Sequence, residues 1–288
     1  MNPISLPNYD QPSVPFAPRA IEKGKSLAVL LGQEAIAYLA RNIQIVEPEF
    51  NVEAFVAEAA TDLEPLALMD RGRHIANALF SHLPKPYERG LAVLVKSMAS
   101  PQPSTTEFGL AGFFYLPHSF FIAQFGISPE YNEGKDPFDS SMQAQHALTQ
   151  RFSAEFCLRP FIIADQKRTL EVVYQWLNDD DTHVRRLCSE GTRPKLPWGL
   201  RLKAFVEDPN PLHPILDTLK DDPELYVRRS VANSLGDISK DNEDWVFALC
   251  EAWLDGASKE RKWLIRHAVR YHAKKGHPRA LALREKAK

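Results

Sequence analysis

The sequence predicts an all-α fold, a HEAT-like repeat α-solenoid in which helical pairs stack side by side. Two near-copies of one signal, DDDTHVRRLCSE and DDPELYVRRSVANS, have Val-Arg-Arg cores that begin 43 residues apart, at Val184 and Val227. That separation lies within the period of about 40–47 residues that is typical of HEAT repeats. No stretch alternates apolar and polar residues for long enough to demand a sheet. A solenoid also accommodates a chain of 288 residues, because each repeat buries its apolar face against its neighbours.

The N-terminal segment differs from the rest of the chain. Residues 1–25 carry five prolines and little periodicity, which predicts a Pro-rich extension that is extended or disordered. The repeat domain is expected to cover residues 26–288.

Helical spacing begins at Ser26, since apolar residues then recur three and four positions apart as far as Ile43. Asn51 is placed to cap the next helix. Two further helices are predicted at residues 66–83 and 87–98.

The most apolar run, residues 108–126, is about as long as a membrane span, but Pro117 and His118 interrupt it. A buried core segment of a soluble protein is therefore the better interpretation. After a turn-rich loop, Ser140 or Ser141 is expected to cap a helix that runs to about Phe156.

The C-terminal half shows the repeats most clearly, with prolines and the acidic pairs Asp180-Asp181 and Asp221-Asp222 near the expected helix starts. The predicted helices are Thr169–Leu177, Thr182–Glu190, Pro211–Leu219, Glu224–Leu235, Asp241–Leu254 and Lys259–Lys274.

Charge is distributed unevenly along the chain. Residues 1–150 contain 10 basic and 16 acidic side chains, whereas residues 151–288 contain 25 and 21, so the halves carry −6 and +4. The C-terminal half is therefore expected to face an anion.

The three cysteines, Cys157, Cys188 and Cys250, stand apart, and no CxxC or HExxH motif accompanies them. We expect reduced, buried thiols, no metal and no cofactor. Because no signal peptide is found either, a cytoplasmic protein without a membrane segment is expected.

Extending the repeat register places four polar sets, each built on an i, i+4 pair, on one face. They are Arg151/Glu155, Arg186/Glu190, Arg229/Asn233 with Asp237, and His267/Tyr271 with Lys275. Equivalent faces of a solenoid line up along one side, commonly the concave one, so Glu155, Glu190 and Asp237 are expected to converge among arginines. The alternative is that these are ordinary helix ion pairs, each contributing about 0.2–0.5 kcal/mol.

A face of this composition has a chemical implication. Basic residues would hold phosphates, but carboxylates beside them would repel DNA. Stabilising a cation, either a positively charged base or an oxocarbenium-like sugar, would give those acids a purpose. Trp198, in the loop RPKLPWG, could press against such a group or simply cover the core between helices, and the sequence leaves both open.

The segment SEGTRPKLPWGLRLKAFVEDPNPLHPILDTLKDDPELYVRRSVANSLGDISKD resembles the AlkC branch of the AlkC/AlkD DNA alkylation-repair glycosylases. The resemblance extends to FNVEAFV, GRHIANAL and LTQRFSAEFCLRPF, and covers roughly residues 26–283. It implies a HEAT-like glycosylase domain whose concave groove holds duplex DNA. The implied activity is excision of cationic N3-alkylated bases, 3-methyladenine and 3-methylcytosine, in base excision repair. A monomer that needs no cofactor is expected.

Carried over residue by residue, the resemblance assigns catalytic roles to Glu190, Asp237, Glu155 and Trp198. The carboxylates, Glu190 first, would stabilise the charge developing on the deoxyribose and place a water, while Trp198 would pack against the lesion nucleotide. The candidates for phosphate contacts are Arg159, Arg185, Arg186, Arg193, Lys195, Arg228, Arg229 and Lys240.

Two other classes of function stay open at this point. The chain could be a non-catalytic HEAT-repeat module that binds DNA or a protein, which predicts binding without base release. It could also be a protein scaffold only, which predicts no salt-dependent binding to duplex DNA.

Overall fold

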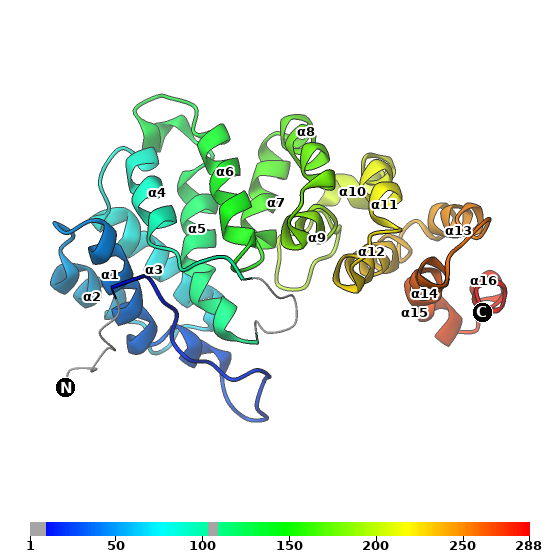
Figure 1. Cartoon of the computed structure of the whole chain (residues 1–288), viewed down its shortest axis with the longest axis horizontal. Coiled ribbons are helices and arrows are strands. Elements are labelled where there is room, and N and C mark those ends of the chain that lie inside the picture. Colours follow the sequence, from blue (N-terminus) through cyan, green and yellow to red (C-terminus); the bar gives the residue numbers. More distant parts are fainter. Residues whose placement is uncertain (1–9, 103–108) are drawn as a thin grey trace. The chain divides into compact units, whose positions relative to one another are not determined.

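The computed structural model describes residues 10–102 and 109–288, which form α-helices and short 3-10 helices with no strand among them (Figure 1). The predicted all-α helical-repeat fold is confirmed. The chain divides into two compact units, Met1–Cys157 and Leu158–Lys288, and the division falls inside helix α7 (Glu155–Ala164).

Helix α3 is central to the first unit, since it packs against both α2 and α5. Asn51 caps α2 as predicted, because its Oδ1 accepts the Ala54 N–H at 3.1 Å. Helix α5, in the most apolar run of the sequence, is almost wholly buried and forms the expected core segment. The elements of this unit are η1 (Leu27–Leu31), α1 (Gln33–Val46), α2 (Val52–Ala60), α3 (Leu68–His82), α4 (Tyr87–Lys96), η2 (Ala111–Tyr115), α5 (Leu116–Phe125), η3 (Pro129–Asn132) and α6 (Phe138–Thr149).

The described part of the Pro-rich extension contains no helix, and it is attached to α1. The Ser13 N–H donates to Asn42 Oδ1 at 3.1 Å, and Asn42 Nδ2 donates back to the Ser13 carbonyl at 2.7 Å. Pro15 is buried. Residues 1–9, which belong to the same prediction, lie outside the described residues.

The helix expected from Ser140 or Ser141 to about Phe156 was wrong at both ends. Helix α6 already begins at Phe138, whose N–H donates to Asp136 Oδ1 at 3.0 Å, so neither serine is its cap. The helix ends at Thr149, and α7 starts only at Glu155. Arg151 and Glu155 therefore do not share a helix, as their predicted i, i+4 pairing required.

The repeat register is confirmed in the second unit, where α12 (Leu225–Ile238) packs against both α9 (Thr182–Glu190) and α14 (Lys259–Ala268). Val184, Val227 and Ile265, which the register aligned, are each 0% exposed. Helix α9 has the predicted bounds because Asp181 Oδ1 caps it, accepting the His183 N–H at 2.7 Å.

The elements of this unit are α8 (Gln166–Gln175), η4 (Trp176–Asn178), α9 (Thr182–Glu190), α10 (Lys203–Glu207), η5 (Asn210–Leu212), α11 (His213–Leu219), α12 (Leu225–Ile238), α13 (Glu243–Ala252), α14 (Lys259–Ala268), α15 (Arg270–Lys274) and α16 (Pro278–Lys286). The sequence did not predict α10 or α16, and the single helix expected over residues 259–274 is broken at Val269.

Candidate active site

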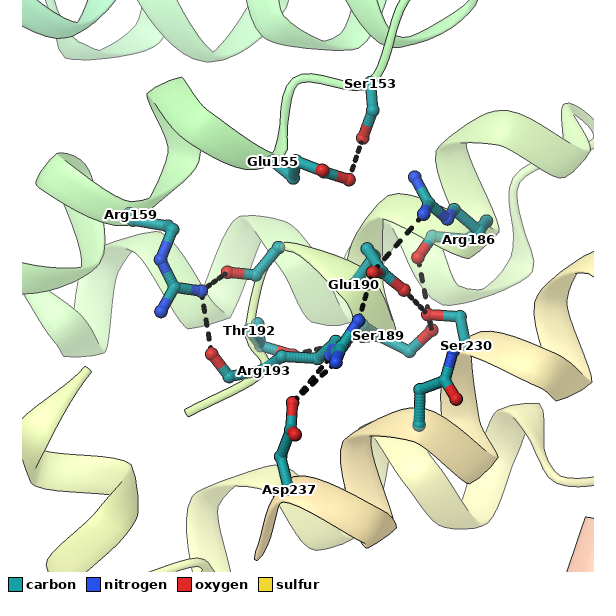
Figure 2. Close-up of polar contacts among 12 residues, drawn as sticks. Ser153, Glu155, Arg159, Arg186, Ser189, Glu190, Thr192, Arg193, Ser230 and Asp237 are labelled. Carbon is teal, nitrogen blue, oxygen red and sulfur yellow. Dashed lines mark hydrogen bonds and ion pairs between the residues drawn. The ribbon is translucent and has the colours of Figure 1, made fainter. Parts of the chain in front are cut away.

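Glu190 is the last residue of α9 and is only 5% exposed. Its Oε1 lies 2.5 Å from Arg193 Nη1 and 3.4 Å from Arg186 Nη2, and its Oε2 accepts a hydrogen bond from Ser230 Oγ at 2.6 Å (Figure 2). Arg186 is one helical turn before Glu190, so the i, i+4 pair predicted from the sequence exists. Ser230 comes from α12, the neighbouring repeat.

Asp237, on α12, meets the other side of the same guanidinium. Its Oδ2 lies 2.8 Å from Arg193 Nε and 2.7 Å from Arg193 Nη2, and its Oδ1 lies 3.2 Å from Lys240 Nζ. Like Glu190, Asp237 is 5% exposed. The register predicted that Glu190 and Asp237 would meet, and Arg193 is the group that joins them (Figure 2).

The surroundings keep Glu190 ionised. Burial alone would raise the pKa of its carboxyl, but the Arg186 and Arg193 charges and the hydrogen bonds from Ser230 and Arg193 outweigh burial, and the pKa lies below its ordinary value of 4.5. For Arg193, burial acts to lower the pKa, and the two carboxylates raise it above the ordinary value. At neutral pH Glu190 and Arg193 are therefore both charged.

Ser230 is a site residue that the sequence interpretation missed. Besides donating to Glu190, its hydroxyl lies 2.7 Å from Ser189 Oγ, so two serines from adjacent repeats support the carboxylate. The sequence could have indicated Ser230, because it places a hydroxyl on the buried face of the VRRSVANS helix, where apolar residues are usual and a buried hydroxyl needs a hydrogen-bond partner.

Arg159 was predicted to contact phosphate, and this is corrected by the structure because its side chain is fully buried. Its guanidinium donates to the carbonyl oxygens of Gly191 at 3.0 Å and Arg193 at 2.7 Å, and also to those of Pro194 and Leu200. Loop 191–200 is therefore folded around Arg159, which satisfies carbonyls that would otherwise be buried without partners.

Trp198 lies in this loop and is 61% exposed. The exposure excludes the alternative in which it covers the core between helices. Its φ of 61° is in the left-handed region, which is strained for a bulky aromatic residue. Since such strain persists only where the surroundings impose it, we infer that the loop anchored on Arg159 holds the backbone at Trp198 in this conformation.

Glu155 begins α7, and its Oε2 accepts a hydrogen bond from Ser153 Oγ at 2.6 Å (Figure 2). It belongs to the first unit, whereas Glu190, Asp237 and Trp198 belong to the second.

The remaining candidates for phosphate contacts differ in what they already bind. Arg185 pairs with Asp222, and Arg228 donates to the Asp222 and Pro223 carbonyls and is 8% exposed. The buried Arg228 therefore serves the α11–α12 turn, which corrects its assignment to DNA, whereas the assignment of Arg185 stays a prediction. Lys195 pairs with Asp241, and Lys240 with Asp237. Arg229 is exposed.

In the described part of the chain, no three His, Cys, Asp or Glu side chains are grouped so as to hold a metal ion. None of the described helices is both long and apolar enough to cross a membrane.

Known proteins resemble this chain along most of its length. The model of the DNA alkylation repair enzyme family matches residues 149–272. The uncharacterized protein YhaZ of Bacillus subtilis (strain 168) is 34% identical over 259 residues, which are 89% of this chain and 67% of YhaZ. The solved structure of Pseudomonas fluorescens alkylpurine DNA glycosylase AlkC, bound to DNA containing an abasic site analog, superposes with a TM-score of 0.79 at 36% identity. That match covers 90% of this chain and 67% of AlkC. The chain thus belongs to the DNA alkylation repair enzyme family, in its AlkC branch.

Proposed function

We propose that this protein is a DNA glycosylase that excises cationic N3-alkylated bases, 3-methyladenine and 3-methylcytosine, from duplex DNA. The observation that carries the proposal is the buried cluster in which Arg193 joins Glu190 of one repeat to Asp237 of the next. The likeness to AlkC, which was solved on DNA with an abasic site analog, supports DNA as the partner.

The charge state of Glu190 fits this substrate class. A base alkylated at N3 already carries a positive charge, so it leaves as a neutral molecule when the N-glycosidic bond breaks. No acid is needed to protonate it, and a carboxyl whose pKa is lowered cannot serve as one. What the reaction needs is a negative charge near the oxocarbenium-like sugar and a base for the incoming water.

The electron pair of the N-glycosidic bond leaves with the base, water adds to C1′ of the deoxyribose, and a carboxylate accepts the proton that the water loses. We assign charge stabilisation first to Glu190, and then to Asp237 and Glu155. Trp198, exposed at the loop, would pack against the lesion nucleotide.

The cluster holds three cations, Arg186, Arg193 and Lys240, against the carboxylates Glu190 and Asp237. This excess of positive charge does not favour a cationic lesion. A DNA phosphate that binds one of the cations supplies the missing negative charge. Arg186 suits this role, since its contact with Glu190 is the longest at 3.4 Å and its departure leaves Arg193 and Ser230 in place.

Excision is tested by incubating the purified protein with a methylated duplex and identifying the released bases by chromatography. We expect 3-methyladenine and 3-methylcytosine, each accompanied by an equal amount of abasic sites. Salt-dependent binding to the duplex without any released base would support the non-catalytic binding module instead. Absence of salt-dependent binding between about 50 and 200 mM salt would support the scaffold.

A further inference from the structure

A cleft of about 620 Å³ opens beside Asp237 within the second unit. Residues of α12, α14, α15 and α16 line it together with Arg193. Tyr271, which the repeat register placed on the same face as Glu190 and Asp237, also lines the cleft and is 42% exposed. The proposed chemistry at Glu190 and Asp237 gives this cleft no role.

The lining of the cleft is strongly basic. Asp237 is the one carboxylate among the described residues that line it, and it already binds two of the cations, Arg193 and Lys240. The cationic lining residues are Arg193, Lys240, Arg270, Lys274 and Arg284. The cleft therefore carries a large positive excess, and Lys274 and Arg284 both lie exposed at its wall.

The positive charge of the cleft affects Arg270, which lies close to Arg193. Its guanidinium donates to the His267 carbonyl at 2.6 Å and to Asn233 Oδ1 at 3.0 Å, two neutral acceptors. Burial lowers its pKa, the like charge of Arg193 lowers it further, and Asp237 opposes both only in part. An anion in the cleft would relieve the repulsion between the two guanidinium groups.

We propose that this cleft binds a backbone phosphate of the DNA, adjacent to the nucleotide held at Glu190 and Asp237. The inference rests on the proposed function for the neighbouring nucleotide, but the phosphate contact itself does not depend on base release. A phosphodiester brings one negative charge and oxygens that guanidinium and ammonium groups bind well. The Tyr271 ring offers an aromatic surface for the adjoining sugar or base.

The site is tested with the double variant Lys274→Gln/Arg284→Gln and the matched control Lys259→Gln/Lys262→Gln. The control removes two charges from α14 in the same unit, outside the cleft lining. Binding is measured to a duplex that carries an uncleavable abasic-site analog, at several salt concentrations between about 50 and 200 mM. Removing one cation that binds a phosphate lowers the slope of log K against log salt by about 0.9.

We expect the cleft variant to bind roughly tenfold more weakly at low salt, with a slope reduced by about 1–2, while the control keeps the wild-type slope. Equal losses of affinity and slope in the two variants would overturn the proposal, because they would show that only the net charge of the unit matters and that the cleft is not a specific phosphate site. Thermal melting checks that both variants fold, and Arg270→Lys, which keeps the charge, should fall between wild type and the cleft variant.

An experiment with inorganic phosphate distinguishes a site for a DNA backbone phosphate from a site for free phosphate. Suppose that inorganic phosphate stabilises the wild type but not the cleft variant, while both proteins bind the duplex equally well. That result would overturn the proposal and indicate a site for free phosphate. If the wild type releases no base and the cleft variant still shows the reduced slope, the phosphate site stands and the proposed glycosylase function fails.

Discussion

Replacing Arg193 by methionine tests whether one guanidinium holds Glu190 and Asp237 together. The side chain of Arg193 is 11% exposed, and those of Glu190 and Asp237 are 6% and 7% exposed. Removing one partner of a buried ion pair costs about 3–5 kcal/mol, because the other charge stays buried. Glu190 keeps Ser230 and Arg186, and Asp237 keeps Lys240, so we expect the low end of that range, about 3 kcal/mol.

The loss of stability is measured by urea unfolding at pH 7, followed by tryptophan fluorescence. All five tryptophans lie between residues 176 and 263, so the signal reports the second unit alone. Arg279→Met is the matched control, since Arg279 also bridges two acids, Asp244 and Glu251, but at the surface. Solvent screening should make the effect of this control much smaller.

Two further measurements sharpen the result. The triple variant Glu190→Gln/Arg193→Met/Asp237→Asn should recover much of the stability, because it leaves no buried charge unpaired. The pKa of Glu190 is depressed in the folded protein, so its stabilisation is present above about 4.5 and fades as the pH falls through the folded pKa. A loss in Arg193→Met no larger than in Arg279→Met, or a triple variant as unstable as the single one, would refute the reasoning.

Three other predictions follow from the site. Ser230→Ala removes the donor to Glu190 Oε2, so the acid limb of the excision rate should move to higher pH than in the wild type; an unmoved limb would show that Ser230 does not set the ionisation of Glu190. Arg159→Met leaves the carbonyls of loop 191–200 without a donor and should cost about 3 kcal/mol or more in urea unfolding, whereas a loss under about 1 kcal/mol would contradict its anchoring role. Trp198→Ala should keep the melting temperature within about 2 °C, because the side chain is 61% exposed, and should weaken binding to the abasic-site duplex several-fold; unchanged binding would remove Trp198 from the DNA contact.

The sequence predicted those parts of the fold that periodicity and local capping determine. Val184, Val227 and Ile265 are buried because a helix in a repeat must direct the same positions inward. The bounds of α9 were predicted correctly because Asp181 supplies a local cap. Extending the register back to Glu155 was less successful, since it assumed an unbroken helix through residues 150–154, where the chain turns.

The contacts within the site could not be read from the sequence in the same way. A list of basic residues does not separate Arg159, enclosed by carbonyls, from Arg229, which is exposed. One feature of the sequence did indicate that Arg159 is buried. After Glu155, which begins the helix EFCLRPFIIA, Arg159 is the single charged residue among apolar ones. The link from Arg193 to both carboxylates depends on how closely α9 and α12 approach, which is a tertiary property.

The central claim is that an ionised Glu190 stabilises the transition state of base excision, and Glu190→Gln tests it most directly. Single-turnover release of 3-methyladenine should be compared in the wild type and the variant at saturating enzyme, with binding to the abasic-site duplex as the control. We predict that the variant still binds the duplex but releases the base at least about tenfold more slowly, equivalent to about 1.4 kcal/mol or more of transition-state stabilisation. Release by Glu190→Gln at the wild-type rate would contradict the claim.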